Sequence, residues 1–180
     1  MGEMSYTGEE GYFRVPAYKA RRRRKFEPNL VFVAMPIKQR GMSTVYAIIK
    51  EECAKLGLDA NRVDENVGAV SIVEEVVNLI KLAEFIIFDL TYERPNVYYE
   101  LGYAQGIGNG PLDILLIAKE GVNLHFDIAA LRVQFYQNHE NLRAIIKRNL
   151  KAMMLVTRKI AKPKVLRKPS GRGGSKTRNN

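Results

Sequence analysis

The sequence predicts one α/β domain in which a five-stranded parallel sheet lies between two layers of helices. Short apolar runs with the length of buried strands alternate along the chain with longer runs that repeat at helical spacing. Strands that alternate with helices pair in parallel through right-handed crossovers. The chain has 180 residues, of which 46% are hydrophobic, enough for one domain with a packed core and too few for two.

Five apolar runs are predicted to form the strands. They are short, rich in Val, Ile, Leu and Phe, and bounded by turn-forming residues, as is typical of strands buried on both faces. The predicted strands are residues 30–35, 58–63, 85–90, 112–118 and 131–136. Pro36 ends the first strand, and the central third strand carries one carboxylate, Asp89, to its carboxyl end.

Four segments with apolar residues at helical spacing are predicted to form the helices. The predicted helices are residues 45–56, 72–83, 97–106 and 139–160. Ser43 or Thr44 is expected to cap the first helix, and Gly57 to end it. Ser71 is expected to cap the second helix and Asn96 the third. The Gly-rich turn at 106–110 follows a helix instead of opening one, so it does not predict a phosphate loop.

Five parallel strands are most commonly arranged in the flavodoxin-like, Rossmann-like order 2-1-3-4-5, which gives a three-layer sandwich. In that order the chain reverses direction between strands 1 and 3, and a crevice opens at their carboxyl ends. The loop with Met35 and Pro36 and the loop at 89–96 flank this crevice. Asp64 follows the second strand, where it either reaches the crevice or is an ordinary loop charge.

Two basic segments flank the predicted domain. The chain has 29 Lys and Arg against 19 Asp and Glu, a net charge of +10, and much of the excess lies in Arg21–Lys25 and from Lys159 onward. The sequence therefore divides into an irregular basic arm at 1–28, the α/β domain at 29–161, and a basic tail at 162–180 that is expected to be disordered. Both arms either attract a polyanion such as nucleic acid, without sequence preference, or serve as solubilising termini.

The remaining composition excludes several classes of protein. Cys53 is the single cysteine, so no intramolecular disulfide framework exists. No apolar stretch approaches the roughly 18 residues of a membrane span, and no signal peptide is evident, so we expect a cytoplasmic protein without membrane contact. His125 and His139 lack ligand companions at useful spacing, so neither a metal site nor another cofactor is expected.

The stretch from Phe88 to Ala104 contains two carboxylates around a turn. Asp89 ends a strand, and Glu100 lies in or just after the first turn of a helix, facing the positive end of the helix dipole. This position favours the ionised form by about 0.3–1 kcal/mol, which suits a nucleophile or an electrostatic stabiliser. The alternatives are that Asp89 caps the following turn and that Glu100 is a surface residue that stabilises the helix.

The motif Asp89-Leu90-Thr91 and the run Pro95-Asn96-Val97-Tyr98-Tyr99-Glu100-Leu101-Gly102-Tyr103-Ala104 resemble the nucleoside 2-deoxyribosyltransferase-like superfamily, which is related in fold to TIR-type NAD hydrolases. Residues 31–36 and Arg62–Glu65 support the resemblance, which covers about residues 30 to 137. The resemblance implies that Glu100 is the nucleophile of a retaining glycosyl transfer, forming a covalent intermediate with the sugar. Asp89 is then the candidate that assists the leaving base or holds the ribose hydroxyls.

Three further residues are candidates for substrate binding. Arg94 stands where the deoxyribosyltransferases have an acidic residue, six positions before the nucleophile, and favours a phosphate-bearing substrate. Asn96 is first a helix cap whose side chain is also available to a ligand. Tyr98, together with Tyr99, either forms a wall beside a nucleobase or packs against the rest of the domain. Members of the superfamily commonly complete the crevice with a neighbouring subunit, so a homo-oligomer is expected.

The sequence thus predicts an enzyme that hydrolyses or transfers the N-glycosidic bond of a nucleotide or nucleoside-like small molecule through Glu100. The alternative is a catalytically silent nucleotide-binding or sensor module whose basic arms bind nucleic acid.

Overall fold

Five parallel strands form one sheet in the order β2-β1-β3-β4-β5, as the sequence predicts. The structure, a computed structural model, describes residues 26–65, 72–125, 128 and 131–161. The strands are β1 (Glu27–Ala34), β2 (Asp59–Asn61), β3 (Ala83–Asp89), β4 (Ile114–Lys119) and β5 (Val133–Tyr136). The helices are α1 (Met42–Lys55), α2 (Ile72–Leu82), α3 (Pro95–Gly106) and α5 (His139–Ala161), with a short 3-10 helix, η1, at Val63–Glu65.

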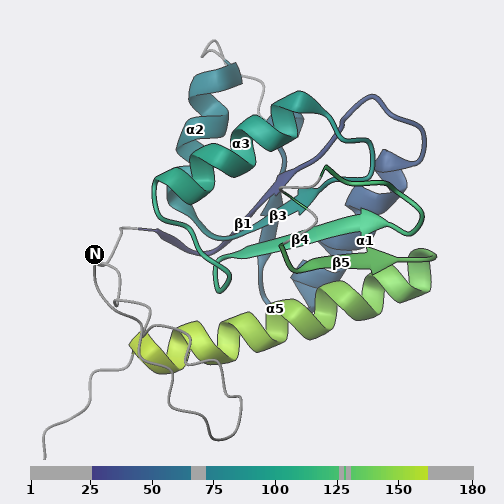
Figure 1. The fold of residues 1–180 in the computed structure, drawn as a ribbon. Coiled ribbons are helices and arrows are strands. Elements are labelled where there is room, and N and C mark those ends of the chain that lie inside the picture. The colour runs from purple at the N-terminus through teal and green to yellow at the C-terminus, as the bar shows by residue number, and fades with distance from the viewer. Residues whose placement is uncertain (1–25, 66–71, 126–127, 129–130, 162–180) are drawn as a thin grey trace, which may run out of the picture.

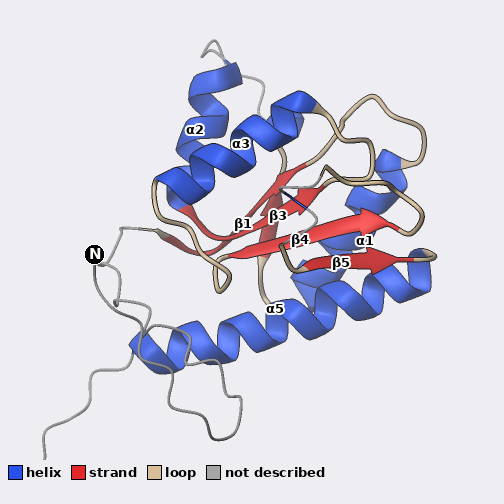
Figure 2. Ribbon diagram, in the orientation of Figure 1, coloured by secondary structure: helices blue, strands red, loops and turns tan. Residues whose placement is uncertain are grey.

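Helices cover both faces of the sheet, α2 and α3 on one face and α1 and α5 on the other (Figures 1 and 2). Successive side chains of a strand point to opposite faces, so each strand contributes side chains to the hydrophobic core on either side of the sheet. In β1, Val31 and Val33 pack with α1 and α5. Leu30 and Phe32 alternate with them and pack with α2 and α3. Because both faces of the sheet are covered, the strand segments are apolar at nearly every position.

The ends of α1 are set by two glycines. Gly41 is the N-cap, with φ 83°, and no side chain caps the helix, so the predicted cap at Ser43 or Thr44 is wrong: both residues lie inside the first turn. The predicted stop at Gly57 is confirmed. Gly57 has φ 71°, and the amide of Leu58 donates to the carbonyl of Cys53 at 2.9 Å, which satisfies a terminal carbonyl of the helix.

Several predicted boundaries are displaced. The second strand spans only Asp59–Asn61, because the chain turns into η1 at Val63. Ala83, predicted at the end of a helix, instead begins β3 directly after α2. The predicted cap at Ser71 lies outside the described residues. Within the part of the chain that the structure describes, no helix is both long and apolar enough to cross a membrane.

The connection from β3 to α3 is a tight turn. The amide of Glu93 donates to the carbonyl of Leu90 at 3.0 Å, and Glu93 takes a left-handed conformation with φ 46°. Arg94 is the N-cap of α3 and Pro95 its first residue, so the predicted cap at Asn96 is wrong. Proline suits the first helical position because its fixed φ matches the helix and its missing N–H would have no partner there.

Candidate active site

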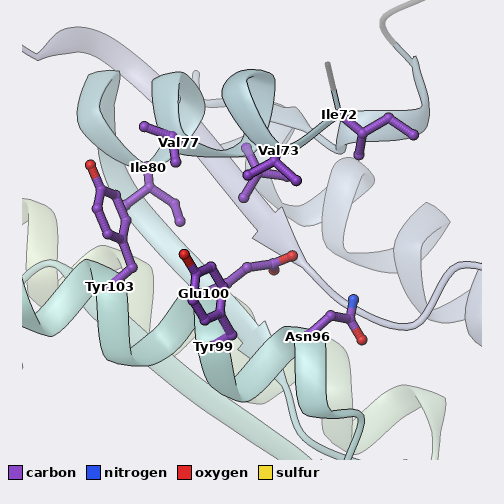
Figure 3. A pocket seen from close by; sticks show the side chains of 9 residues that line it. Ile72, Val73, Val77, Ile80, Asn96, Tyr99, Glu100 and Tyr103 are labelled. Carbon is purple, nitrogen blue, oxygen red and sulfur yellow. The ribbon is translucent and has the colours of Figure 1, made fainter.

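Glu100 lines a pocket between α2 and α3 with a cavity volume of about 190 Å³. Figure 3 shows its side chain extending from α3 into the space between the two helices. The α3 residues in the pocket recur at helical spacing and so share one face. The lining residues are Ile72, Val73, Val76, Val77 and Ile80 of α2, and Asn96, Tyr99, Glu100 and Tyr103 of α3. The walls are therefore mostly apolar, with one ionisable carboxyl and one amide.

Burial raises the pKa of the Glu100 carboxyl to about 7. The side chain is half-buried, and no hydrogen bond or ion pair joins it to any other residue that the structure describes. The expectation that the helix dipole favours the ionised form is wrong. Glu100 lies beyond the first turn of α3, which starts at Pro95, and the dipole acts mainly within that turn. Desolvation by the apolar walls decides the pKa.

Glu100→Gln is therefore expected to stabilise the protein in alkaline solution. A carboxyl with a raised pKa in the folded state contributes stability that is present below the unfolded pKa and is lost as pH rises through about 7. Gln has the same shape and no charge, so the variant avoids this loss. Allowing for the solvent that still reaches the carboxyl, we expect it to be about 1–2 kcal/mol more stable than the parent above pH 8. Urea unfolding at about pH 4 and about pH 8.5 measures the difference, which should be close to zero at the lower pH.

The other predicted residues in and before α3 do not all lie on the same side of the helix as Glu100. Asn96 lines the pocket with Glu100, one turn before it. Tyr98 lies elsewhere: its hydroxyl donates to Glu93 at 3.4 Å, and its ring meets His125 edge-on at 5.8 Å. Arg94 is exposed at the N-cap.

Asp89 is buried without any exposed surface at the end of β3. The amide of Thr91 donates to its Oδ1 at 2.9 Å, and the hydroxyl of Tyr136 donates to its Oδ2 at 3.5 Å. The first bond is the local turn bond that the sequence left open as an alternative role for this residue. Burial raises the pKa of Asp89, and the hydrogen bonds from Thr91 and Tyr136 oppose that rise.

Two of the predicted residues after β1 and β2, Met35 and Asp64, contact Arg62. Met35 and Pro36 are buried. Arg62 donates to both carboxylate oxygens of Asp64, at 2.5 and 2.8 Å, and its Nη1 lies 3.9 Å from the sulfur of Met35. Its guanidinium also stacks over Tyr46, 4.2 Å from the ring centroid. Asp64 thus forms an ion pair with Arg62, a residue to which the sequence assigned no role.

The two predicted catalytic carboxylates lie in different surroundings. Glu100 faces α2, whereas Asp89 bonds to Thr91 and Tyr136, which border a second crevice near α1 and α5. The sequence pointed to Tyr99 only as one of a tyrosine pair with Tyr98, and it gave no site role to Tyr103 or to the apolar face of α2. The helical spacing of Glu100 and Tyr103 places them on one face of α3, and this spacing could have indicated that Tyr103 lines the same pocket. The described residues contain no group of three His, Cys, Asp or Glu side chains that could hold a metal ion.

Comparison with known proteins identifies relatives in fold alone. No protein-family model and no curated protein matches the chain. The CMP N-glycosidase BcmB of Clostridium botulinum superposes with a TM-score of 0.52 at 15% identity, over 64% of this chain and 97% of that one. A flavo di-iron protein of Thermotoga maritima superposes with a TM-score of 0.53 at 15% identity, over 72% of this chain and 37% of that one.

A 2-deoxyribosyltransferase of Bacillus psychrosaccharolyticus also matches, with a TM-score of 0.49 at 16% identity, over 63% of this chain and 90% of that one. The fold expected from the resemblance to the nucleoside 2-deoxyribosyltransferase-like superfamily is confirmed.

Proposed function

We propose that the protein cleaves the N-glycosidic bond of a nucleotide or nucleoside-like small molecule, by hydrolysis or transfer, with Glu100 as the nucleophile. The observation that carries the proposal is the half-buried carboxyl of Glu100, aimed into an apolar pocket between α2 and α3 with no partner among the described residues. The shared fold with an enzyme named as a CMP N-glycosidase supports it.

The pocket suits a retaining reaction. As the C–N bond breaks, the ionised carboxylate beneath the anomeric carbon bonds to the oxocarbenium-like centre, and the departing base takes a proton from water. Water or a second base then attacks the same carbon and regenerates the carboxylate. A cavity of about 190 Å³ is below the usual 300–1,000 Å³ of ligand sites, so it fits a pentose better than a whole nucleotide.

The neighbouring polar groups fit roles around the sugar. The amide of Asn96 lies on the same helix face as Glu100 and is placed to bind hydroxyls. Arg94, exposed at the N-cap of α3 two residues before Asn96, is available to a phosphate. The assignments of Asp89 to the leaving base and of Met35, Pro36, Asp64 and Tyr98 to the substrate stay predictions.

The pH profile separates a nucleophile from a general acid. Because a nucleophilic Glu100 must be ionised, kcat/KM of base release should rise about tenfold per pH unit up to about 7 and then level off. A general acid at this position must be protonated, and the rate would fall above the same pH. Base release between pH 5 and 9 in buffers of constant ionic strength distinguishes the two roles.

The direct test of the function is a substrate panel. Nucleosides, their mono- and diphosphates, and NAD are each incubated with the full chain, and free base is measured by chromatography. We expect saturable release from a subset of the panel. Calorimetric binding of a nucleotide without any base release would instead support the silent nucleotide-binding module.

The expected homo-oligomer also stays a proposal. Ile72, Val73 and Tyr99 at the pocket are 70%, 60% and 68% exposed, an apolar surface of the kind that a second subunit covers. The proposed contact of nucleic acid with the basic arms concerns 1–25 and 162–180, which lie outside the described residues.

A further inference from the structure

A second crevice lies at the carboxyl edge of the sheet, on the side of α1 and α5. Its cavity volume is about 210 Å³, and it shares no lining residue with the Glu100 pocket. The end of β5 and the start of α5 meet at this edge (Figure 1). The lining residues are Arg40, Gly41, Met42, Val45, Thr91, Tyr92, Lys119, Tyr136, Gln137, Asn138 and His139.

The charged lining of this crevice is entirely basic. Arg40 borders it from the β1–α1 connection, Lys119 from the end of β4 and His139 from the start of α5, and no Asp or Glu is among the lining residues. All three side chains are exposed, and none forms an ion pair with a residue in the described ranges. Basic groups that are brought together without acidic partners repel one another, and a bound anion relieves that repulsion.

The floor of the crevice is a fixed set of hydroxyls. Tyr136 is 3% exposed, and its hydroxyl lies 3.2 Å from Oγ1 of Thr91. The backbone amide of Lys119 donates to the same Oγ1 at 3.0 Å. Asp89 lies behind these hydroxyls and accepts a hydrogen bond from Tyr136 at 3.5 Å. These hydroxyls are bonded to one another and to Asp89, so the floor is rigid and polar but offers no hydroxyl proton to a ligand.

The start of α1 adds to the positive potential. Gly41 and Met42 line the crevice, and α1 has no side-chain cap, so the positive end of its dipole faces this space. Asn138, by contrast, caps α5 by accepting from the amide of Asn141 at 2.9 Å. The uncapped α1 start supplements the charges of Arg40 and Lys119.

We propose that this crevice binds a phosphoryl group, either inorganic phosphate or the phosphate of a small metabolite. Arg40 and Lys119 supply the positive charge and the hydrogen-bond donors that the acceptor oxygens and the double negative charge of phosphate require. The volume is too small for a whole nucleotide, so the phosphate is the recognised group. The site is independent of the proposed glycosidase function.

The test titrates the full chain with phosphate. Inorganic phosphate and ribose 5-phosphate are added at constant ionic strength, and binding is followed by calorimetry and by backbone amide NMR shifts. The largest shifts are expected at Gly41, Thr91 and Lys119, and similar shifts with both probes assign recognition to the phosphate alone. Much tighter binding of ribose 5-phosphate identifies a phosphate monoester as the ligand class.

Variants separate the crevice from the basic arms. Arg40→Gln and Lys119→Gln each remove one cation without changing a backbone bond, and each is expected to weaken phosphate binding at least fivefold. Lys147→Gln removes an exposed cation from α5 outside the crevice and should change affinity less than twofold. Phosphate binding that is equal in all four proteins, absent at millimolar concentration, or without shifts at the three amides would overturn the proposal. Because the two pockets share no residue, that result leaves the Glu100 proposal unaffected.

Discussion

Glu100→Gln is expected to lower kcat/KM for base release by about 10³-fold or more, with little effect on folding at pH 6. The amide keeps the shape of the side chain in the pocket between α2 and α3, but it cannot form the covalent bond to the sugar. Substrate binding should persist, since the remaining walls of the pocket are unchanged. Chromatographic assay of free base together with calorimetric Kd separates the two quantities.

The matched control is Glu74→Gln, the same chemical change on an exposed face of α2 outside the pocket. It should retain the parent rate within about twofold, because surface substitutions away from special features have small effects. A Glu100→Gln protein that releases base as fast as the control would remove Glu100 from the chemistry.

Asp89→Ala is expected to lower the free energy of unfolding by about 2–4 kcal/mol. The substitution leaves the amide of Thr91 and the hydroxyl of Tyr136 without their acceptor, and it opens a cavity beneath the sheet edge. Asp89→Asn keeps an acceptor for the Thr91 amide, so it should cost less than about 1.5 kcal/mol. Urea unfolding of the three proteins measures both differences.

Activity of the Asp89→Asn protein decides between two roles for this carboxyl. If Asp89 only holds the turn after β3, the variant should keep most of its base-release activity. A variant as stable as the parent that has lost base release would instead support the predicted role in the departure of the base. Equal stability of Asp89→Ala and the parent would contradict the anchoring role of these hydrogen bonds.

The sheet was predictable from sequence because its strands are buried on both faces. Runs such as 85–88 are apolar at every position, and the alternation with helices then permits few topologies. The boundaries were less predictable where local preferences compete. Asn96 has a strong capping preference, yet Pro95 fits the first helical position and moves the cap to Arg94.

The position of Glu100 on a helix after β3 was predictable from the motif, but its chemistry was not. Its pKa depends on the apolar face of α2, which packs against α3 only in the folded chain. The separation of Asp89 from Glu100 likewise follows from strand geometry: Asp89 alternates with Phe88 and points to the α1 and α5 face. The spacing of Asp89 and Glu100 along the chain predicts neither the raised pKa of Glu100 nor the separation of the two carboxylates.

The most direct test of Glu100 as the nucleophile is mass spectrometry of the protein quenched during turnover. A substrate with an electron-withdrawing group at C2 of the sugar slows hydrolysis of the intermediate and lets it accumulate. We predict the added mass of the sugar, with its phosphate if present, on the proteolytic peptide that contains Glu100, and no adduct in Glu100→Gln. Base release by the parent with no adduct on that peptide, or with the adduct on another residue, would contradict the account.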